Sequence, residues 1–358
     1  MRKTGILAVV IFLVMFGLFM VQLTSAQTTK PADVIHWKGQ SCFPSTVAPY
    51  GPFGPGQTGT GAHGHMWSDW VKKATNGRLV IDWAEPGAIF PIVESDIAVA
   101  KNVVQISATY PSYYAGRIPE SDVETGGVFQ WENEEQVFEC MNKYGLASAI
   151  KKVYEKRNLK WLPFHQDALV GLGTTFQAPN PASIKGKKIR AVGMWSDYIR
   201  MLGGSPVSLP WGEIYMAMKL GTIDGSLVGS GTLEELKLKE VVKSWVFFPR
   251  VSSAFCNFII NMDAWKALPQ DLQILLERDT PYVIYALSSN YNNQCTWILK
   301  NSEQKYGVKL HAWSSEDAQK LTQQAVEEIY PRIAAKSKDT AELLEIVKKQ
   351  MRDYGRIK

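Results

Sequence analysis

The sequence has few of the residue patterns that mark catalytic, metal-binding or nucleotide-binding sites. Its four cysteines form no Cys-x-x-Cys pair, which argues against a zinc knuckle or a dithiol redox site. Of its five histidines, His63 and His65 are a close pair without a convincing third metal ligand near them. No phosphate-binding glycine loop and no G-x-S-x-G nucleophile elbow occurs. The sequence therefore predicts no catalytic residues, no metal and no cofactor.

The chain also lacks an excess of charge of either sign. It has 39 Lys and Arg residues against 34 Asp and Glu residues, for a formal net charge of +5. No block of basic residues stands out as a nucleic-acid footprint. We therefore expect no nucleic-acid partner.

Long apolar runs are scarce as well, and the one present lies near the N-terminus. Arg2-Lys3, an apolar run from Ile6 to Val21 and the small residues Thr24-Ser25-Ala26 follow one another in the order of a secretory signal. We expect residues 1–26 to be removed and the mature protein to reside in the periplasm. The alternative is a retained membrane anchor, since the run is nearly long enough to span a bilayer. Export permits disulfides, with buried free thiols as the equal alternative, at Cys42, Cys140, Cys256 and Cys295.

What the chain does contain is a repeated alternation of strand and helix patterns over 358 residues, rich in aromatic side chains. This length and pattern predict an α/β protein with two lobes. A loop rich in Pro and Gly at 44–61 is either a lid beside a ligand or a surface insertion. A kink is expected at Pro281. We expect strands at 34–39, 78–83, 103–108, 159–163, 170–176, 187–192, 206–209, 245–248 and 253–261, and helices at 65–74, 94–100, 134–154, 196–202, 211–220, 232–242, 269–306, 315–335 and 340–354.

The segment Lys185–Gly225 predicts a βαβα unit with one unusual residue. Gly203-Gly204 supplies the left-handed positions that end its first helix. Arg190 lies within the first strand, where a parallel strand is normally continuously apolar. A guanidinium at the carboxyl end of such a strand points into the crevice where α/β sheets bind ligands, and its planar fork suits a carboxylate. The alternative is a salt bridge to a buried acid.

The same segment carries a family resemblance. The run KGKKIRAVG…LGGSPVSLPWGEIYMAMKLGTIDG resembles the substrate-binding proteins of TRAP transporters, the DctP-like family of periplasmic receptors for organic acids. A weaker similarity extends from Val34 to Tyr306, including YYAGRIPE at 113–120 and NMDAWKALPQDLQ at 261–273. The resemblance implies a two-lobed periplasmic-binding-protein-like fold with a hinge and a long helix spanning both lobes. We assign 27–160 to lobe I, 161–250 to lobe II, and 251–358 to a return strand, the spanning helix and C-terminal helices shared between the lobes.

The resemblance also implies which residues bind the substrate. Arg190 falls on the arginine that binds the substrate carboxylate in that family. The other candidates are a tryptophan that starts a helix at the same crevice, three tyrosines on the loop of the opposite lobe and one polar amide. Core packing is the alternative for the aromatic residues and a surface position for the amide. These candidates are Trp211, Tyr110, Tyr113, Tyr114 and Gln166.

One departure from the family bears on the substrate. Many relatives carry amide and carboxylate side chains just after the Asp-Gly pair, where this chain has Ser226, Leu227 and Val228. We therefore expect no metal-bridged substrate and a more apolar wall. The function we predict is a receptor for an organic carboxylate, a monocarboxylate with an aromatic or branched body, that delivers it to a TRAP-type membrane permease. The alternatives are an extracytoplasmic enzyme on this scaffold and a ligand sensor for a signalling partner.

Overall fold

The structure of the chain, a computed structural model, describes the backbone of residues 33–44 and 60–358, and the side chains of these residues apart from 60–64 and 165–169. The signal segment predicted at 1–26 and nearly all of the loop at 44–61 lie outside the described residues. The chain divides at Ile35, and the fold below is that of His36–Lys358, which form one unit. No helix within 33–44 and 60–358 combines the length and the apolar character that a membrane span requires.

A mixed ten-stranded sheet lies at the centre of this unit. Its strands follow the order β2-β1-β3-β9-β4-β7-β5-β6, with β8 paired to β4 and β10 paired to β8. The pairs β1–β3, β5–β6 and β5–β7 are parallel, whereas β9 and β4 run antiparallel to their neighbours. The strands are β1 (Ile35–Ser41), β2 (Leu79–Ala84), β3 (Ile106–Thr109), β4 (Leu159–Thr174), β5 (Lys188–Arg190), β6 (Ser205–Val207), β7 (Gly225–Gly229), β8 (Ser244–Phe248), β9 (Ser252–Asn261) and β10 (Lys309–Ala312).

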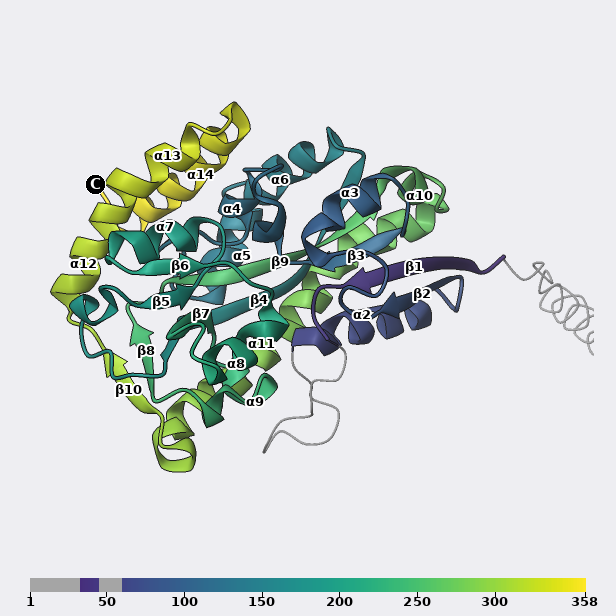
Figure 1. The fold of residues 1–358 in the computed structure, drawn as a ribbon. Helices are drawn as coiled ribbons and strands as arrows, with labels where there is room; N and C mark the ends of the chain where they lie inside the picture. Colours follow the sequence, from purple (N-terminus) through teal and green to yellow (C-terminus); the bar gives the residue numbers. More distant parts are fainter. Residues whose placement is uncertain (1–32, 45–59) are drawn as a thin grey trace, which may run out of the picture. The chain divides into compact units, whose positions relative to one another are not determined.

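Strands β4 and β9 join the two halves of the sheet. The first part of β4, Leu159–Pro163, pairs with the end of β9, which in turn pairs with β3. The last part of β4, Val170–Thr174, pairs with β7, the neighbour of β5. Figure 1 shows the two long strands side by side through the middle of the sheet. The carboxyl ends of β1, β3, β5 and β7 therefore all lie near this pair of strands.

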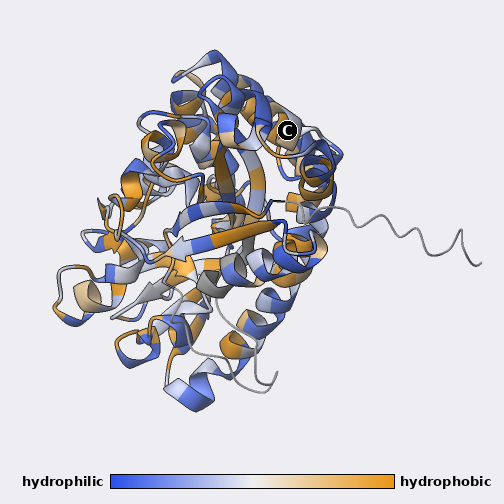
Figure 2. Ribbon diagram, turned by 90° about the vertical axis from the view of Figure 1, so that its right-hand side faces the viewer, coloured by the Kyte–Doolittle hydropathy of each residue, from blue (hydrophilic) through white to orange (hydrophobic). Residues whose placement is uncertain are grey.

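Helices cover the sheet, and the longest packs on β4. Helix α11 (Gln270–Tyr306) has 37 residues, and its extent agrees with the helix predicted at 269–306. It continues through Pro281. In Figure 2 apolar residues concentrate on the central strands, whereas the helices alternate polar and apolar residues. The other helices are α2 (Thr60–Ala74), α3 (Ser95–Ala100), α4 (Ser121–Glu124), α5 (Glu134–Asn142), α6 (Leu146–Glu155), α7 (Met194–Met201), α8 (Ile214–Lys219), α9 (Thr232–Glu235), α10 (Met262–Lys266), α12 (Ser315–Gln324), α13 (Tyr330–Ala334) and α14 (Lys338–Asp353).

The single helix predicted at 134–154 is wrong, because two helices occupy this stretch. Helix α5 ends at Asn142 and α6 begins at Leu146. Gly145 between them has a φ of 88°, in the left-handed region where glycine has no steric penalty. The sequence carried a signal of this break, since Leu146 follows Met141 at a spacing of five positions, whereas neighbours on one helix face are three or four positions apart.

Other predicted boundaries also need correction. The two strands predicted at 159–163 and 170–176 are one strand, β4, because β9 pairs with the intervening residues through two irregularities in register. The helix predicted at 232–242 is short: α9 ends at Glu235, and Lys237 has a φ of 55° before a 3-10 turn at Leu238–Glu240. The sequence did not predict β10. The long C-terminal helix is continuous but includes a π turn at Ala325–Ile329.

A buried polar network joins strands β4 and β9, helices α4 and α6 and the 3-10 turn at Pro111–Tyr114. Glu124 is fully buried, and its carboxylate accepts hydrogen bonds from Asn257 Nδ2 at 2.7 Å, Trp161 Nε1 and the Tyr154 hydroxyl. Asn257 Nδ2 also lies 3.1 Å from the hydroxyl of Tyr114. Burial raises the pKa of Glu124 to about 7, and the three hydrogen bonds oppose this rise. The described side chains that bond this carboxylate include no cation.

We expect this network to make stability depend on pH. The unfolded chain releases the Glu124 proton near its ordinary pKa of 4.5, whereas the folded protein releases it near 7. Stability therefore falls as pH rises between these values, by about 3 kcal/mol, and stays constant above them. In Glu124→Gln this contribution is absent. Urea unfolding of both proteins at about pH 5 and about pH 8 measures the difference.

Glu155→Gln is the matched control, because Glu155 is exposed at the end of α6. Its unfolding curves are expected to follow those of the unmodified protein at both pH values. If the unmodified protein and Glu124→Gln differ by the same free energy at both values, Glu124 does not titrate in this range.

Candidate ligand-binding site

A cavity lies where the carboxyl ends of the parallel strands meet β4 and β9. This is the edge at which open α/β sheets bind ligands. Strands β1, β3, β5 and β7 each contribute residues at or just after their last position. The lining residues are Phe43, Tyr110, Tyr113, Val170, Arg190, Trp195, Trp211, Leu227, Val228, Gly229, Thr232, Ala254, Cys256 and Tyr291.

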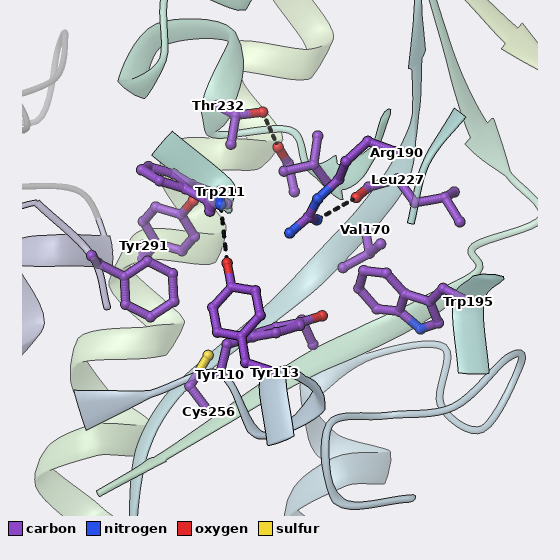
Figure 3. Close-up of a pocket in the computed structure, with 14 residues that line it drawn as sticks. Tyr110, Tyr113, Val170, Arg190, Trp195, Trp211, Leu227, Thr232, Cys256 and Tyr291 are labelled. Carbon is purple, nitrogen blue, oxygen red and sulfur yellow. Dashed lines mark hydrogen bonds between the residues drawn. The ribbon is translucent and has the colours of Figure 1, made fainter. Parts of the chain in front are cut away.

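Arg190 is the one cation among these lining residues. It ends β5 and is only 2% exposed. Its Nε donates to the carbonyl of Leu209 at 3.2 Å and its Nη1 to the carbonyl of Leu227 at 3.4 Å. These carbonyls come from the segments after β6 and within β7, so the ends of three strands orient the guanidinium. Figure 3 shows it directed into the space between Trp211, Tyr113 and Val170.

The charge of Arg190 has no protein counter-charge among the described side chains. None of the described Asp and Glu side chains forms an ion pair with Arg190. The alternative predicted from the sequence, a salt bridge to a buried acid, therefore has no support among these residues. Tyr113 stays neutral, because burial raises its pKa to about 12 even though Arg190 lowers it. A buried cation without an anion is costly. The cavity is therefore suited to an anionic group of a ligand.

Aromatic rings form two sides of the cavity. The rings of Tyr110 and Tyr113 lie 5.5 Å apart, and Tyr110 contacts Trp195 edge-on at 6.1 Å. On the other side Trp211 meets Phe43 edge-on at 5.7 Å. The Tyr113 hydroxyl accepts a hydrogen bond from the backbone N–H of Trp211 at 3.0 Å, which joins the two sides (Figure 3). Flat faces of this kind suit a planar or branched apolar body.

The remaining surface offers few polar groups. Val170, Leu227 and Ala254 contribute aliphatic surface from the central strands. The Thr232 hydroxyl donates to the carbonyl of Gly229 at 2.6 Å, so its proton is already engaged. A second charge or a row of hydroxyls on a ligand would therefore lose water with little replacement.

The described residues contain no group of three or more His, Cys, Asp or Glu side chains that could hold a metal ion. Leu227 and Val228, which were predicted from the sequence to form an apolar wall, line the cavity. A metal ion would find no carboxylate among the lining residues.

The structure brings most of the predicted site residues together, but not all of them. Arg190, Trp211, Tyr110 and Tyr113 line the cavity. Tyr114 does not, because it faces away from it into the Glu124 network. The backbone of Gln166 pairs with Phe255 in β9, and its side chain lies outside the described residues. For all six predicted residues, the role of ligand contact stays a prediction.

Eight further lining residues were not predicted from the sequence; besides Val170, Gly229 and Ala254, five of them carry an aromatic ring, a hydroxyl or a thiol. They lie far apart in the chain and meet only through the sheet topology and the long helix. Trp195 had a local signal, since it follows the Arg190 strand by a few residues. The others carry no pattern that separates them from core residues. The five are Phe43, Trp195, Thr232, Cys256 and Tyr291.

The cysteines, which the sequence left open between disulfides and thiols, are buried thiols in the structure. Burial raises the pKa of Cys140 to about 12 and that of Cys42 as well. Both are therefore neutral thiols at physiological pH and poor nucleophiles.

Comparison with known proteins identifies the family. The family model of bacterial extracellular solute-binding proteins, family 7, matches residues 54–337. The chain belongs to this family. Its members are binding proteins without enzymatic activity, which confirms the prediction of no enzyme.

Individual relatives agree with this assignment. The chain is 26% identical over 298 residues to a monocarboxylate 2-oxoacid-binding periplasmic protein of Nostoc sp., covering 80% of each chain. It is similar to a TRAP transporter solute-binding protein of Bordetella bronchiseptica with calcium and picolinate bound, at 19% identity, a TM-score of 0.78 and coverage of 90% and 93% of the two chains. A TRAP periplasmic solute-binding protein of Rhodoferax ferrireducens with bound malonate matches at 18% identity and a TM-score of 0.77, covering 90% of this chain and all of the other.

The family and the structural neighbours confirm the predicted two-lobed binding-protein fold with its long helix. The exact lobe boundaries at 160 and 250 stay a prediction.

Proposed function

We propose that this family 7 protein is a periplasmic receptor for a small organic monocarboxylate with an aromatic or branched body, and that it delivers this acid to a TRAP-type permease. The observation that carries the proposal is the buried Arg190 guanidinium, which is oriented by two carbonyls and has no anion among the described side chains. A solute carboxylate would supply the missing charge with bidentate geometry. The Nostoc relative that binds monocarboxylate 2-oxoacids supports this class.

The shape of the cavity supports an apolar body next to the carboxylate. Tyr110, Tyr113, Trp195 and Trp211 present ring surfaces on either side of the guanidinium. The aliphatic surface of Val170 and Leu227 closes the space between them. The solute would enter with its charge toward Arg190 and its body between the rings.

The first test is Arg190→Lys. A lysine keeps the charge but loses the planar fork, so affinity for the natural acid is expected to fall by roughly 30-fold to 1000-fold, on the order of 2–4 kcal/mol. Isothermal titration calorimetry measures the dissociation constant. Arg200→Lys is the control, since Arg200 is exposed on α7 and pairs with Asp197 at 2.9 Å. An unchanged constant in Arg190→Lys, with normal circular dichroism, would assign Arg190 a structural role.

A second test concerns ions. Because Leu227 and Val228 replace the usual polar side chains and no lining residue is a carboxylate, binding is expected to need neither a divalent ion nor sodium. Titrations in sodium-free buffer treated with a chelator are expected to give the same affinity as titrations in sodium buffer with calcium. A large loss of affinity that calcium or sodium restores would contradict this expectation.

The third test concerns the body of the solute. Burying a ring with about 100 Å² of apolar area favours an aromatic acid over a compact polar acid by roughly 2–3 kcal/mol. Benzoate-like acids and branched 2-oxo acids are expected to raise the melting temperature more than succinate, malate and sugar acids do. Arg190→Gln is the control that should abolish every response from this pocket. A response limited to dicarboxylates or sugar acids would show that the apolar wall does not face the solute.

A further inference from the structure

Two walls of the pocket contact each other directly at three hydrogen bonds. The first wall, residues 110–127, follows β3, and the second wall, residues 190–211, runs from the end of β5 through β6. Besides the bond from Trp211 N to the Tyr113 hydroxyl, Trp195 Nε1 donates to the carbonyl of Gly126 at 2.8 Å. Met194 N donates to Asp122 Oδ1 at 3.2 Å. In each of these three bonds the second wall donates and the first wall accepts.

Asp122 supplies a helix cap that the second wall lacks. Met194 is the first residue of α7, and Gly193 before it has no side chain to accept the free N–H groups. Gly193 has a φ of 55°, and a Cβ there would lie 2.1 Å from Asp122 Oδ1. The close approach of the two walls at this point therefore depends on glycine at 193.

The other oxygen of Asp122 is paired with a cation from the C-terminal part of the chain. Lys336 Nζ lies 3.1 Å from Asp122 Oδ2, with the carboxylate side chain 1% exposed. Ser112 Oγ donates to Oδ1 at 3.5 Å. Burial raises the pKa of Asp122, the charge of Lys336 and the Met194 N–H lower it, and Asp197 raises it. Asp197 is itself paired with Arg200 at 2.9 Å and Arg332 at 3.7 Å.

We propose that Asp122 is a positioning residue that holds the two walls together around the bound solute. This inference rests on the proposed function. Asp122 does not line the cavity, so it acts through Met194 and helix α7, which follows Arg190 and carries Trp195. It contributes to retention of the solute rather than to its recognition. Lys336 keeps the carboxylate in its accepting position.

The kinetic test uses the tryptophans of the pocket as reporters. Stopped-flow fluorescence with benzoate and with α-ketoisovalerate gives association and dissociation rates for each variant. Asp122→Ala is expected to dissociate roughly tenfold faster, the effect of one lost hydrogen bond to a charged group, with an association rate within about twofold. Asp122→Asn keeps an oxygen acceptor for Met194 N and is expected to restore most of the retention. The order of preference among acids is expected to remain the same.

Asp96→Ala is the matched control. Asp96 is also a buried carboxylate paired with a half-exposed cation, and Arg117 Nε lies 2.8 Å from its Oδ2. This pair joins α3 to residues of the first wall and does not reach the second wall. Asp96→Ala is expected to lose stability without a change in dissociation rate. Equal acceleration of dissociation in both variants would overturn the positioning role. So would an association rate in Asp122→Ala that falls by the same factor as its dissociation rate rises.

A ligand-independent measurement separates this inference from the proposed function. If neither acid binds the unmodified protein, the proposed solute class fails. Small-angle X-ray scattering without ligand then tests the walls alone, where Asp122→Ala is expected to have a larger radius of gyration than the unmodified protein and Asp96→Ala the same radius. An unchanged radius in Asp122→Ala, with unchanged dissociation where an acid does bind, would overturn the inference.

Discussion

The site depends on one electrostatic constraint, a guanidinium buried at the end of a strand with carbonyl oxygens as its described partners. Leu209 and Leu227 fix the direction of Arg190, but neutral dipoles do not replace a counter-charge. The fold can hold this cation because β5, β6 and β7 end at the same place and satisfy two of its donors. In the function we propose, a ligand of opposite charge supplies the missing counter-charge, so that solute binding and electrostatic compensation are the same event.

The aromatic walls complement this charge because they exclude water without offering competing partners. Tyr113 is held neutral by burial, and its hydroxyl is engaged by Trp211 N. Attraction between the proposed solute carboxylate and Arg190 would therefore act in a poorly hydrated space, where it is stronger than in bulk water. The same scarcity of polar groups restricts what else the solute can carry. Affinity for the charge and selectivity for the body thus come from one arrangement.

Sequence reasoning was most accurate where local chemistry determines structure. The unit from β5 to α8 followed from Gly203, the apolar periodicity and the exceptional Arg190, and all of these act within a few residues. It failed where tertiary pairing overrides local signals: polar residues after Pro163 read as a break, yet β9 carries β4 through them. The pocket showed the same limit, because Tyr291 reaches it from a helix whose register depends on packing against β4.

The loop after β3 shows why neighbouring tyrosines could not be separated from sequence. Tyr110 and Tyr113 face the cavity, whereas Tyr114 turns into the network of Glu124 and Asn257. The 3-10 turn at Pro111–Tyr114 sends adjacent side chains in different directions, and no composition rule distinguishes them. Tyr114 nonetheless supports the site, although it does not line the cavity. Because its hydroxyl is bonded within a fully buried cluster, the turn is fixed, and the rings of Tyr110 and Tyr113, which line the cavity, are presented from a rigid base.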